Sequence, residues 1–165
     1  MIRAVDSGRR IMSFKPVHYY LLDSRISGDP DPRCRQVEPK DHREIDLFIT
    51  GLSDDPIYYE GMLDLPAFGI WEKNRLVAFA GTLFLDQERN AGQIGGFLTD
   101  PSRRGQGFAT ALGKTLIQAL TKIGVKVIRL EVYADNIVAR QIYEKLGFKL
   151  EDLAPLAIIR GVPSN

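Results

Sequence analysis

The sequence contains few of the residues that stabilise small secreted proteins or bind metals. It has one cysteine, Cys34, which cannot form an internal disulfide and which fits a reducing compartment. Its two histidines, His18 and His42, are far from any zinc-ligand spacing. The composition therefore excludes a scaffold held by internal disulfides, and we expect no metal site.

Long apolar runs and a strong net charge are absent as well. No apolar stretch approaches the roughly 18 residues that a membrane span needs. Arg9 and Arg10 could begin a twin-arginine export signal, but residues 14–20 are too polar to continue it. The net charge of +1 gives no electrostatic footprint for nucleic acid. We expect a cytoplasmic protein of one domain, with neither a membrane nor a nucleic-acid partner.

The stretch from Thr99 to Thr110 (TDPSRRGQGFAT) is the most informative part of the chain. An apolar run ends at a proline, and two glycines, Gly105 and Gly107, then precede a helical pattern. Glycines at the start of a helix leave backbone N–H groups uncovered, and the helix dipole adds partial positive charge there. Together with Arg104, these features indicate a site for a diphosphate.

Three phosphate-binding templates compete for this stretch. A P-loop needs four residues between its first glycine and Gly-Lys-Ser/Thr, whereas five separate Gly107 from Gly113. A dinucleotide fingerprint needs a glycine or alanine where this chain has Thr110. The third template, Arg-x-x-Gly-x-Gly/Ala, is met by Arg104, Gly107 and Ala109. The spacing therefore favours the third template.

A second motif follows about thirty residues after the first. Residues 130–136 (LEVYADN) read as a strand that ends at an asparagine, and residues 137–148 (IVARQIYEKLGF) as a short helix that carries a tyrosine. Asp135 or Asn136 can cap this helix. Gly147 stands where a left-handed residue commonly ends one.

The two motifs, in this order, resemble motifs A and B of the GNAT N-acyltransferase superfamily, and the resemblance covers roughly residues 34–160. It implies an α+β fold with a mixed, mostly antiparallel central sheet, helices on both faces, and a splayed strand pair that holds acyl-CoA. It implies acetyl-CoA as co-substrate and direct attack of a primary amine on the thioester. The implied cofactor-binding residues lie on the strand before the turn, on the turn, and before the second helix: Phe97, Leu98, Thr99, Arg104, Gly105, Gln106, Gly107, Phe108, Ala109, Thr110 and Asn136.

The resemblance also implies two residues that move protons. Tyr143 matches the tyrosine that protonates the leaving thiolate in many members, with a packing role as the alternative. Many members carry a glutamate on the strand before the glycine-rich turn, but residues 93–98 contain none. We therefore expect Glu131 to be the general base, at the twelve-residue spacing from Tyr143 that is seen in acetyltransferases of protein α-amino groups. A salt bridge from Glu131 to Arg129, or proton relay through water, is the alternative.

The domain boundaries follow from the same reading. We expect an N-terminal extension at residues 1–33 and an N-acetyltransferase domain at 34–165. Residues 17–22 have strand composition, so the extension is either frayed or adds a strand or arm to a sheet edge, in the same subunit or across a homodimer.

Within the domain, the apolar run at residues 76–80 predicts a central strand covered on both faces. Lys73 and Asn74 predict the turn of a hairpin, and the apolar spacing predicts a helix over residues 105–122.

The sequence does not identify the acceptor amine. We expect its site at residues 56–60, where Tyr58, Tyr59 and Glu60 could hold an amine, at the loop of residues 86–92, and at the strands after Gly147. Our first prediction for the substrate is a primary amine of a small molecule or peptide. The alternatives are a protein N-terminus or lysine, or a CoA-binding module without catalysis.

Overall fold

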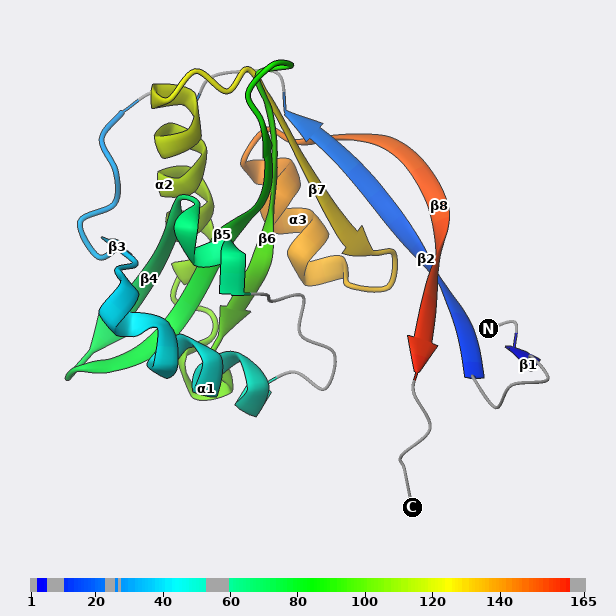
Figure 1. Ribbon diagram of the computed structural model, residues 1–165, viewed down its shortest axis with the longest axis horizontal. Helices are drawn as coiled ribbons and strands as arrows, with labels where there is room; N and C mark the ends of the chain where they lie inside the picture. The colour runs from blue at the N-terminus through cyan, green and yellow to red at the C-terminus, as the bar shows by residue number, and fades with distance from the viewer. Residues whose placement is uncertain (1–2, 6–10, 23–25, 27, 53–59, 161–165) are drawn as a thin grey trace.

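Strands and helices alternate along the described residues of the computed structural model, which are 3–5, 11–22, 26, 28–52 and 60–160 (Figure 1). The strands are β1 (Arg3–Val5), β2 (Ile11–Leu22), β3 (Arg35–Gln36), β4 (Ala67–Glu72), β5 (Arg75–Asp86), β6 (Ala91–Thr99), β7 (Val127–Tyr133) and β8 (Lys149–Arg160). The α-helices are α1 (His42–Leu52), α2 (Phe108–Lys122) and α3 (Ile137–Lys145). Three short 3-10 helices are η1 (Pro39–Asp41), η2 (Glu60–Asp64) and η3 (Pro101–Arg103).

The described strands form one sheet. Its spatial order is β1-β2-β7-β6-β5-β4-β3, and β8 pairs along β2. Every described pairing is antiparallel except that of β6 with β7. This arrangement confirms the predicted α+β class and the mostly antiparallel mixed sheet.

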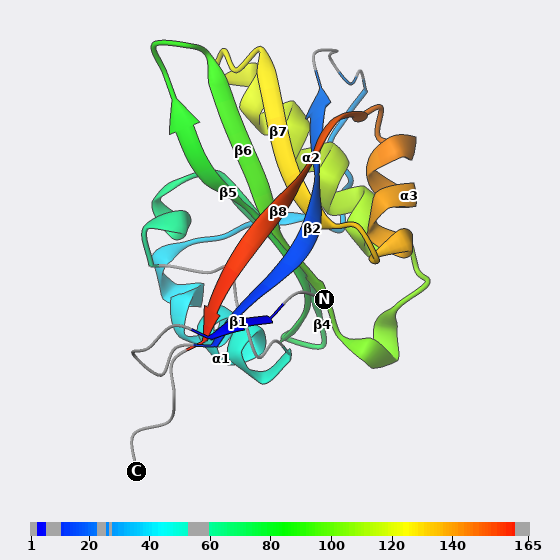
Figure 2. The same ribbon diagram turned by 90° about the vertical axis from the view of Figure 1, so that its right-hand side faces the viewer.

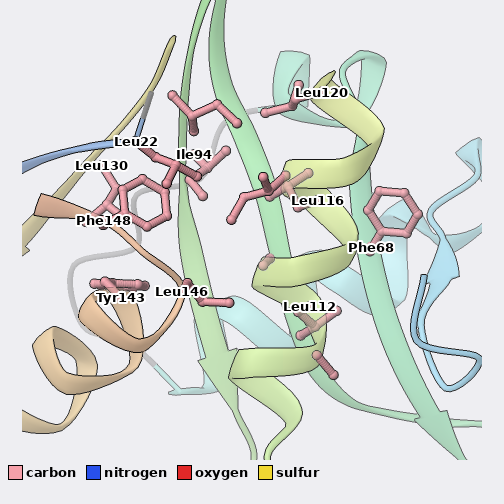
Figure 3. Close-up of a cluster of buried hydrophobic side chains, with 14 of the residues drawn as sticks. Leu22, Phe68, Ile94, Leu112, Leu116, Leu120, Leu130, Tyr143, Leu146 and Phe148 are labelled. Atoms are coloured by element: carbon pink, nitrogen blue, oxygen red, sulfur yellow. The ribbon is translucent and has the colours of Figure 1, made fainter. Parts of the chain in front are cut away.

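Helices cover both faces of the sheet, as the sequence predicted. On one face α2 and α3 pack over a cluster that includes Leu116, Tyr143 and Phe148 (Figures 2 and 3). On the other face α1 contributes Ile45 and Ile49 to a second cluster. The two clusters anchor the strands that carry the candidate site.

Strand β5 contributes to both clusters, because side chains of a strand point to either face of the sheet. Leu76 and Phe79 pack in the cluster with α1, whereas Val77 and Ala80 pack in the cluster with α2. All four are nearly or fully buried. The prediction of a central strand covered on both faces is therefore confirmed.

Backbone conformation explains one turn and corrects one helix boundary. Lys73 and Asn74 both have positive φ, 49° and 62°, in the tight turn between β4 and β5, where the hairpin was predicted. The predicted helix over residues 105–122 begins three residues too early, since α2 starts at Phe108. Gly105 and Gly107 are left-handed, with φ of 77° and 75°, and a right-handed helix cannot include that conformation.

Residues 11–22 form β2 inside the sheet. The sequence alone did not decide whether the N-terminal extension is frayed or adds a strand. Residues 17–22 pair with β7, and residues 11–21 pair with β8. Tyr20 of this strand is buried, and its hydroxyl donates to Glu144 Oε1 of α3 at 2.8 Å. Strand β2 therefore links β7, β8 and α3.

Two further observations bear on the function classes considered above. Within the described ranges, no helix has the length and apolar character needed to cross a membrane. In that same part of the chain, no group of three or more His, Cys, Asp or Glu side chains is arranged to hold a metal ion.

Candidate acyl-CoA site

The candidate site begins where β6 and β7 separate. Their parallel pairing covers only Ala91–Gln93 against Val127–Arg129, although β6 continues to Thr99 and β7 to Tyr133. In Figure 1, β7 leaves β6 towards β2. Beyond Gln93, β6 remains paired with β5, so its other edge has no strand partner among the described residues. Backbone groups on such an edge need another partner. The short pairing of β6 with β7 confirms the predicted splayed strand pair.

A bulge in β6 accompanies the separation. Leu98 lies opposite Phe79 and Gly95 opposite Gly81, so two residues of β6 face the single residue Ala80. Gly96, one of the two, has a φ of 64°. An extra residue bends its strand and increases the local twist. The bulge thus turns β6 at the point where the free edge begins.

The glycine-rich loop follows β6 and leads into α2. Within the described residues, the N–H groups of residues 104–110 donate to no carbonyl or side chain, and the first hydrogen bond of α2 runs from Ala111 to the Gly107 carbonyl. A side chain added at Gly105 or Gly107 would meet nothing within 4 Å. Arg104 is exposed and has no ion-pair partner in the described part of the chain. Unpaired donors, open space and a free cation fit a diphosphate.

Several predicted cofactor-binding side chains have partners within the protein. Phe108 is buried in the cluster with α2, while Phe97 packs against that cluster and Leu98 against the other. The Asn136 side chain accepts a hydrogen bond from the Ala139 N–H at 3.2 Å and so caps α3. For Phe97 and Phe108, the backbone is therefore the part available to a ligand, whereas Leu98 lies opposite Phe79 in the pairing with β5.

Tyr143 lies in α3 beside the separated part of β6. Its ring packs edge to face against Phe97, with ring centres 5.3 Å apart. It also packs edge to face against Phe148, with ring centres 6.2 Å apart (Figure 3). The residue is buried, and burial raises the pKa of the phenol above its ordinary value. Its hydroxyl has no hydrogen-bond partner among the described residues. The structure thus brings together Tyr143 and Phe97, which belong to two different sequence motifs.

Glu131 lies on β7, two residues beyond the end of the parallel pairing. It is exposed, whereas its neighbours Leu130 and Val132 point into the cluster with α2. Gln93 Nε2 donates to Glu131 Oε1 at 3.1 Å. The structure shows no ion pair between Glu131 and Arg129 in its described part, which leaves one carboxylate oxygen of Glu131 for another partner.

Sequence reasoning missed Gln93 as a partner of Glu131. Gln93 lies opposite Arg129 in the parallel pairing, and Glu131 follows Arg129 by two residues on the same face of β7. Only the register of the two strands shows this closeness, because the two residues are 38 positions apart.

The predicted acceptor site is only partly described. Tyr58 and Tyr59 lie outside the described residues, and Glu60 begins η2. In the loop of residues 86–92, Arg89 pairs with Asp86 at 2.9 Å. This loop lies at the opposite end of β6 from the glycine-rich loop.

Comparisons with known proteins indicate the same family as the two sequence motifs. The acetyltransferase (GNAT) family model matches residues 32–148. The chain is 37% identical over 81 residues to the ribosomal protein bS18-alanine N-acetyltransferase of Escherichia coli, a match over 49% of this chain and 53% of that protein. The chain therefore spans about half the length of the curated relatives it matches.

Two solved structures show the same fold. A GNAT-family acetyltransferase from Novosphingobium aromaticivorans superposes with a TM-score of 0.79 and 25% identity, over 92% of this chain and 67% of that one. The ribosomal-protein-S18-alanine N-acetyltransferase of Escherichia coli gives a TM-score of 0.60 and 23% identity, over 79% of this chain and 95% of that one.

Proposed function

The chain belongs to the acetyltransferase (GNAT) family, and from this membership we propose that it transfers an acetyl group from acetyl-CoA to a primary amine. The observation that carries the proposal is the separation of β6 from β7 beyond Gln93, which leads into a loop of unpaired N–H groups. A free strand edge that is followed directly along the chain by an anion site suits a long ligand that carries a diphosphate at one end.

The residues that would hold acetyl-CoA divide between these two parts. Arg104 and the N–H groups of residues 105–110 would bind the diphosphate, and the free edge of residues 97–99 would pair with the pantetheine arm. When bound, acetyl-CoA supplies a thioester whose acetyl group an amine can accept. The N–H near Leu98 is the donor that would stabilise an oxyanion at the reacting carbonyl.

Two side chains would move the protons. An α-amine with a pKa of about 8, like an alkyl amine with a pKa of about 10, is mostly protonated at neutral pH and must lose a proton before it can attack. Glu131 is the proposed acceptor of that proton, with its carboxylate oriented by Gln93. Tyr143 is the proposed donor to the leaving thiolate. A phenol is protonated at neutral pH, and burial raises the pKa of Tyr143 further, so the proton is present when the thiolate forms. No described group accepts that proton.

For the acceptor we propose the α-amine of a peptide or protein as the first class to test. The twelve-residue spacing of Glu131 and Tyr143 supports this choice, and so does the similarity to a ribosomal-protein alanine N-acetyltransferase. A primary amine of a small molecule is the second candidate.

A panel assay tests the proposal. The purified chain is incubated with acetyl-CoA and, in parallel, with alanine-terminated peptides, lysine peptides, polyamines and small amines, and free thiol is followed. We expect thiol release that depends on one class of amine. A chain that acetyl-CoA stabilises but that releases no thiol with any amine would instead be a CoA-binding module.

Arg104→Glu serves as the binding control, since it places an anion against the phosphates. Acetyl-CoA should raise the melting temperature of the wild type by mass action. It should not raise that of Arg104→Glu. An equal rise in both proteins would show that the diphosphate binds elsewhere.

A further inference from the structure

Residues 28–34 lie along α2 and reach the glycine-rich loop, although they precede it by about seventy residues. Gln118 Nε2 donates to the Gly28 carbonyl at 2.6 Å, and the Asp31 N–H donates to Thr115 Oγ1 at 3.2 Å. At the end of this segment, Arg33 Nη1 donates to the Gln106 carbonyl at 3.3 Å. The segment is therefore tied to both α2 and the loop.

The Arg33 guanidinium is held in one orientation. Asp31 accepts from its Nε at 2.9 Å and from its Nη2 at 2.8 Å, so the pair is bidentate. The guanidinium carbon also lies 5.5 Å from the centre of the Phe108 ring. Because Asp31 balances its charge, Arg33 adds little net charge to the loop. Its effect on a ligand must come from the backbone group that it holds.

That backbone group belongs to the peptide between Gln106 and Gly107. In a trans peptide the carbonyl and the following N–H point in opposite directions. No cis peptide occurs in the described chain, so holding the Gln106 carbonyl fixes the direction of the Gly107 N–H. Gly107 has no side chain to restrict its backbone, and this peptide would otherwise be free to rotate.

We propose that Arg33 is a positioning residue of the diphosphate site. It holds the Gln106 carbonyl, and the Gly107 N–H therefore points away from Arg33 and is free for the ligand. This inference rests on the proposed function, since the ligand is the diphosphate of acetyl-CoA. It gives residues 28–34, which precede both sequence motifs, a part in cofactor binding.

The test measures binding to Arg33→Met by isothermal titration with coenzyme A and with dephospho-coenzyme A, which keeps the diphosphate but lacks the 3′-phosphate. Loss of one oriented N–H should weaken binding of both ligands about tenfold. Arg35→Met is the matched control, because Arg35 also pairs with an aspartate, Asp41, and stacks on an aromatic ring, that of Trp71, but none of its contacts in the described part of the chain is with the glycine-rich loop. Its affinities should stay within twofold of the wild type. Weakened binding of coenzyme A alone would mean that Arg33 contacts the 3′-phosphate, and would overturn the proposal.

Asp31→Asn separates positioning from simple attraction. This change frees the Arg33 charge but removes the anion that orients it. Positioning predicts weaker binding of coenzyme A, whereas direct attraction of the phosphates predicts tighter binding. Unchanged or tighter binding would overturn the role of Arg33. Should Arg33→Met fail to fold, Arg33→Lys keeps the charge and loses the planar fork, with the same expected loss.

The outcomes also distinguish this inference from the function on which it rests. A wild-type chain that does not bind coenzyme A overturns the proposed function and the inference together. A wild-type chain that binds coenzyme A, loses binding in Arg104→Glu and keeps it in Arg33→Met overturns the role of Arg33 alone.

Discussion

At the scale of single residues, Tyr143 combines burial with a hydroxyl that no described group engages. Buried phenols usually find a hydrogen-bond partner. The Tyr143 hydroxyl has none among the described residues, and its ring packs against Phe97 on the unpaired edge of β6, so the hydroxyl can donate to a ligand held at that edge.

Tyr143→Phe tests this role, because it removes the hydroxyl and keeps the ring contacts with Phe97 and Phe148. We expect kcat to fall by about 10²–10⁴, as is typical for loss of a general acid. The affinity for acetyl-CoA and the melting temperature should change little. Steady-state rates with the amine found in the panel assay, together with a titration of acetyl-CoA, make the measurement. A kcat within twofold of the wild type would leave Tyr143 with a packing role.

Glu131→Gln tests the other proton transfer at the same scale. The variant keeps the size of the side chain and its contact with Gln93 but cannot accept a proton. If Glu131 is the base, kcat/KM should be lower at every pH near neutrality. If water relays the proton, the ionisation of the substrate amine should govern both profiles, and they should superimpose. A change confined to KM would make Glu131 a binding group for the amine.

At the scale of elements, the loop before α2 depends on backbone that only glycine adopts easily. Gly107→Ala meets no atom within 4 Å, so its cost is conformational. With φ at 75°, we expect the free energy of unfolding to fall by about 1–2 kcal/mol. Gly51→Ala is a matched control in α1, also without a close neighbour, where helix propensity should raise stability by up to about 1 kcal/mol. Urea denaturation measures the change in the free energy of unfolding of each variant, which should be negative for Gly107→Ala and positive for Gly51→Ala. A Gly107→Ala variant more stable than the wild type would contradict this account of the loop.

The elements also show how far the sequence could predict the structure. Local signals sufficed for the β4–β5 hairpin, since Lys73 and Asn74 form its turn. They limited the cap of α3 to Asp135 or Asn136, and in the structure Asn136 is the cap. The start of α2 was wrong by three residues because the left-handed glycines were read as part of the helix. The contacts of Glu131 with Gln93 and of Arg33 with Gln106 could not be predicted, because they join residues 38 and 73 positions apart. Resemblance to a family supplied the splayed strand pair, which no local pattern contains.

At the scale of the whole molecule, ion pairs make stability depend on pH. The hydrogen bond from the Arg33 guanidinium lowers the pKa of Asp31 to about 2, and that from Arg35 lowers the pKa of Asp41. Carboxyls whose pKa is lower in the folded state stabilise it above their unfolded pKa of about 4. That stabilisation is lost as the pH falls through the folded values, so we expect the free energy of unfolding to decrease between about pH 4 and pH 2.

Asp31→Asn should make this decrease shallower. Asp46→Asn is the control, because Asp46 is exposed on α1 and has no ion pair within the described part of the chain. Urea denaturation at several pH values between 2 and 6 gives the slopes for the wild type and both variants. Equal slopes in all three proteins would show that the Asp31–Arg33 pair does not contribute to the loss of stability at low pH.

Strand β2 lies between β7 and β8, so it is synthesised long before the strands with which it pairs. The ribosome releases residues 17–22 more than 100 residues before the β7 strand with which they pair. At about 5–20 residues per second, this strand waits for roughly 5–20 s, longer than hairpins and helices need to form. Pairings so distant in sequence close late and raise the contact order of the fold. Residues 17–22 of a nascent chain therefore remain without their β7 and β8 partners until the last sheet strands emerge, so the sheet around β2 is completed only near the end of synthesis.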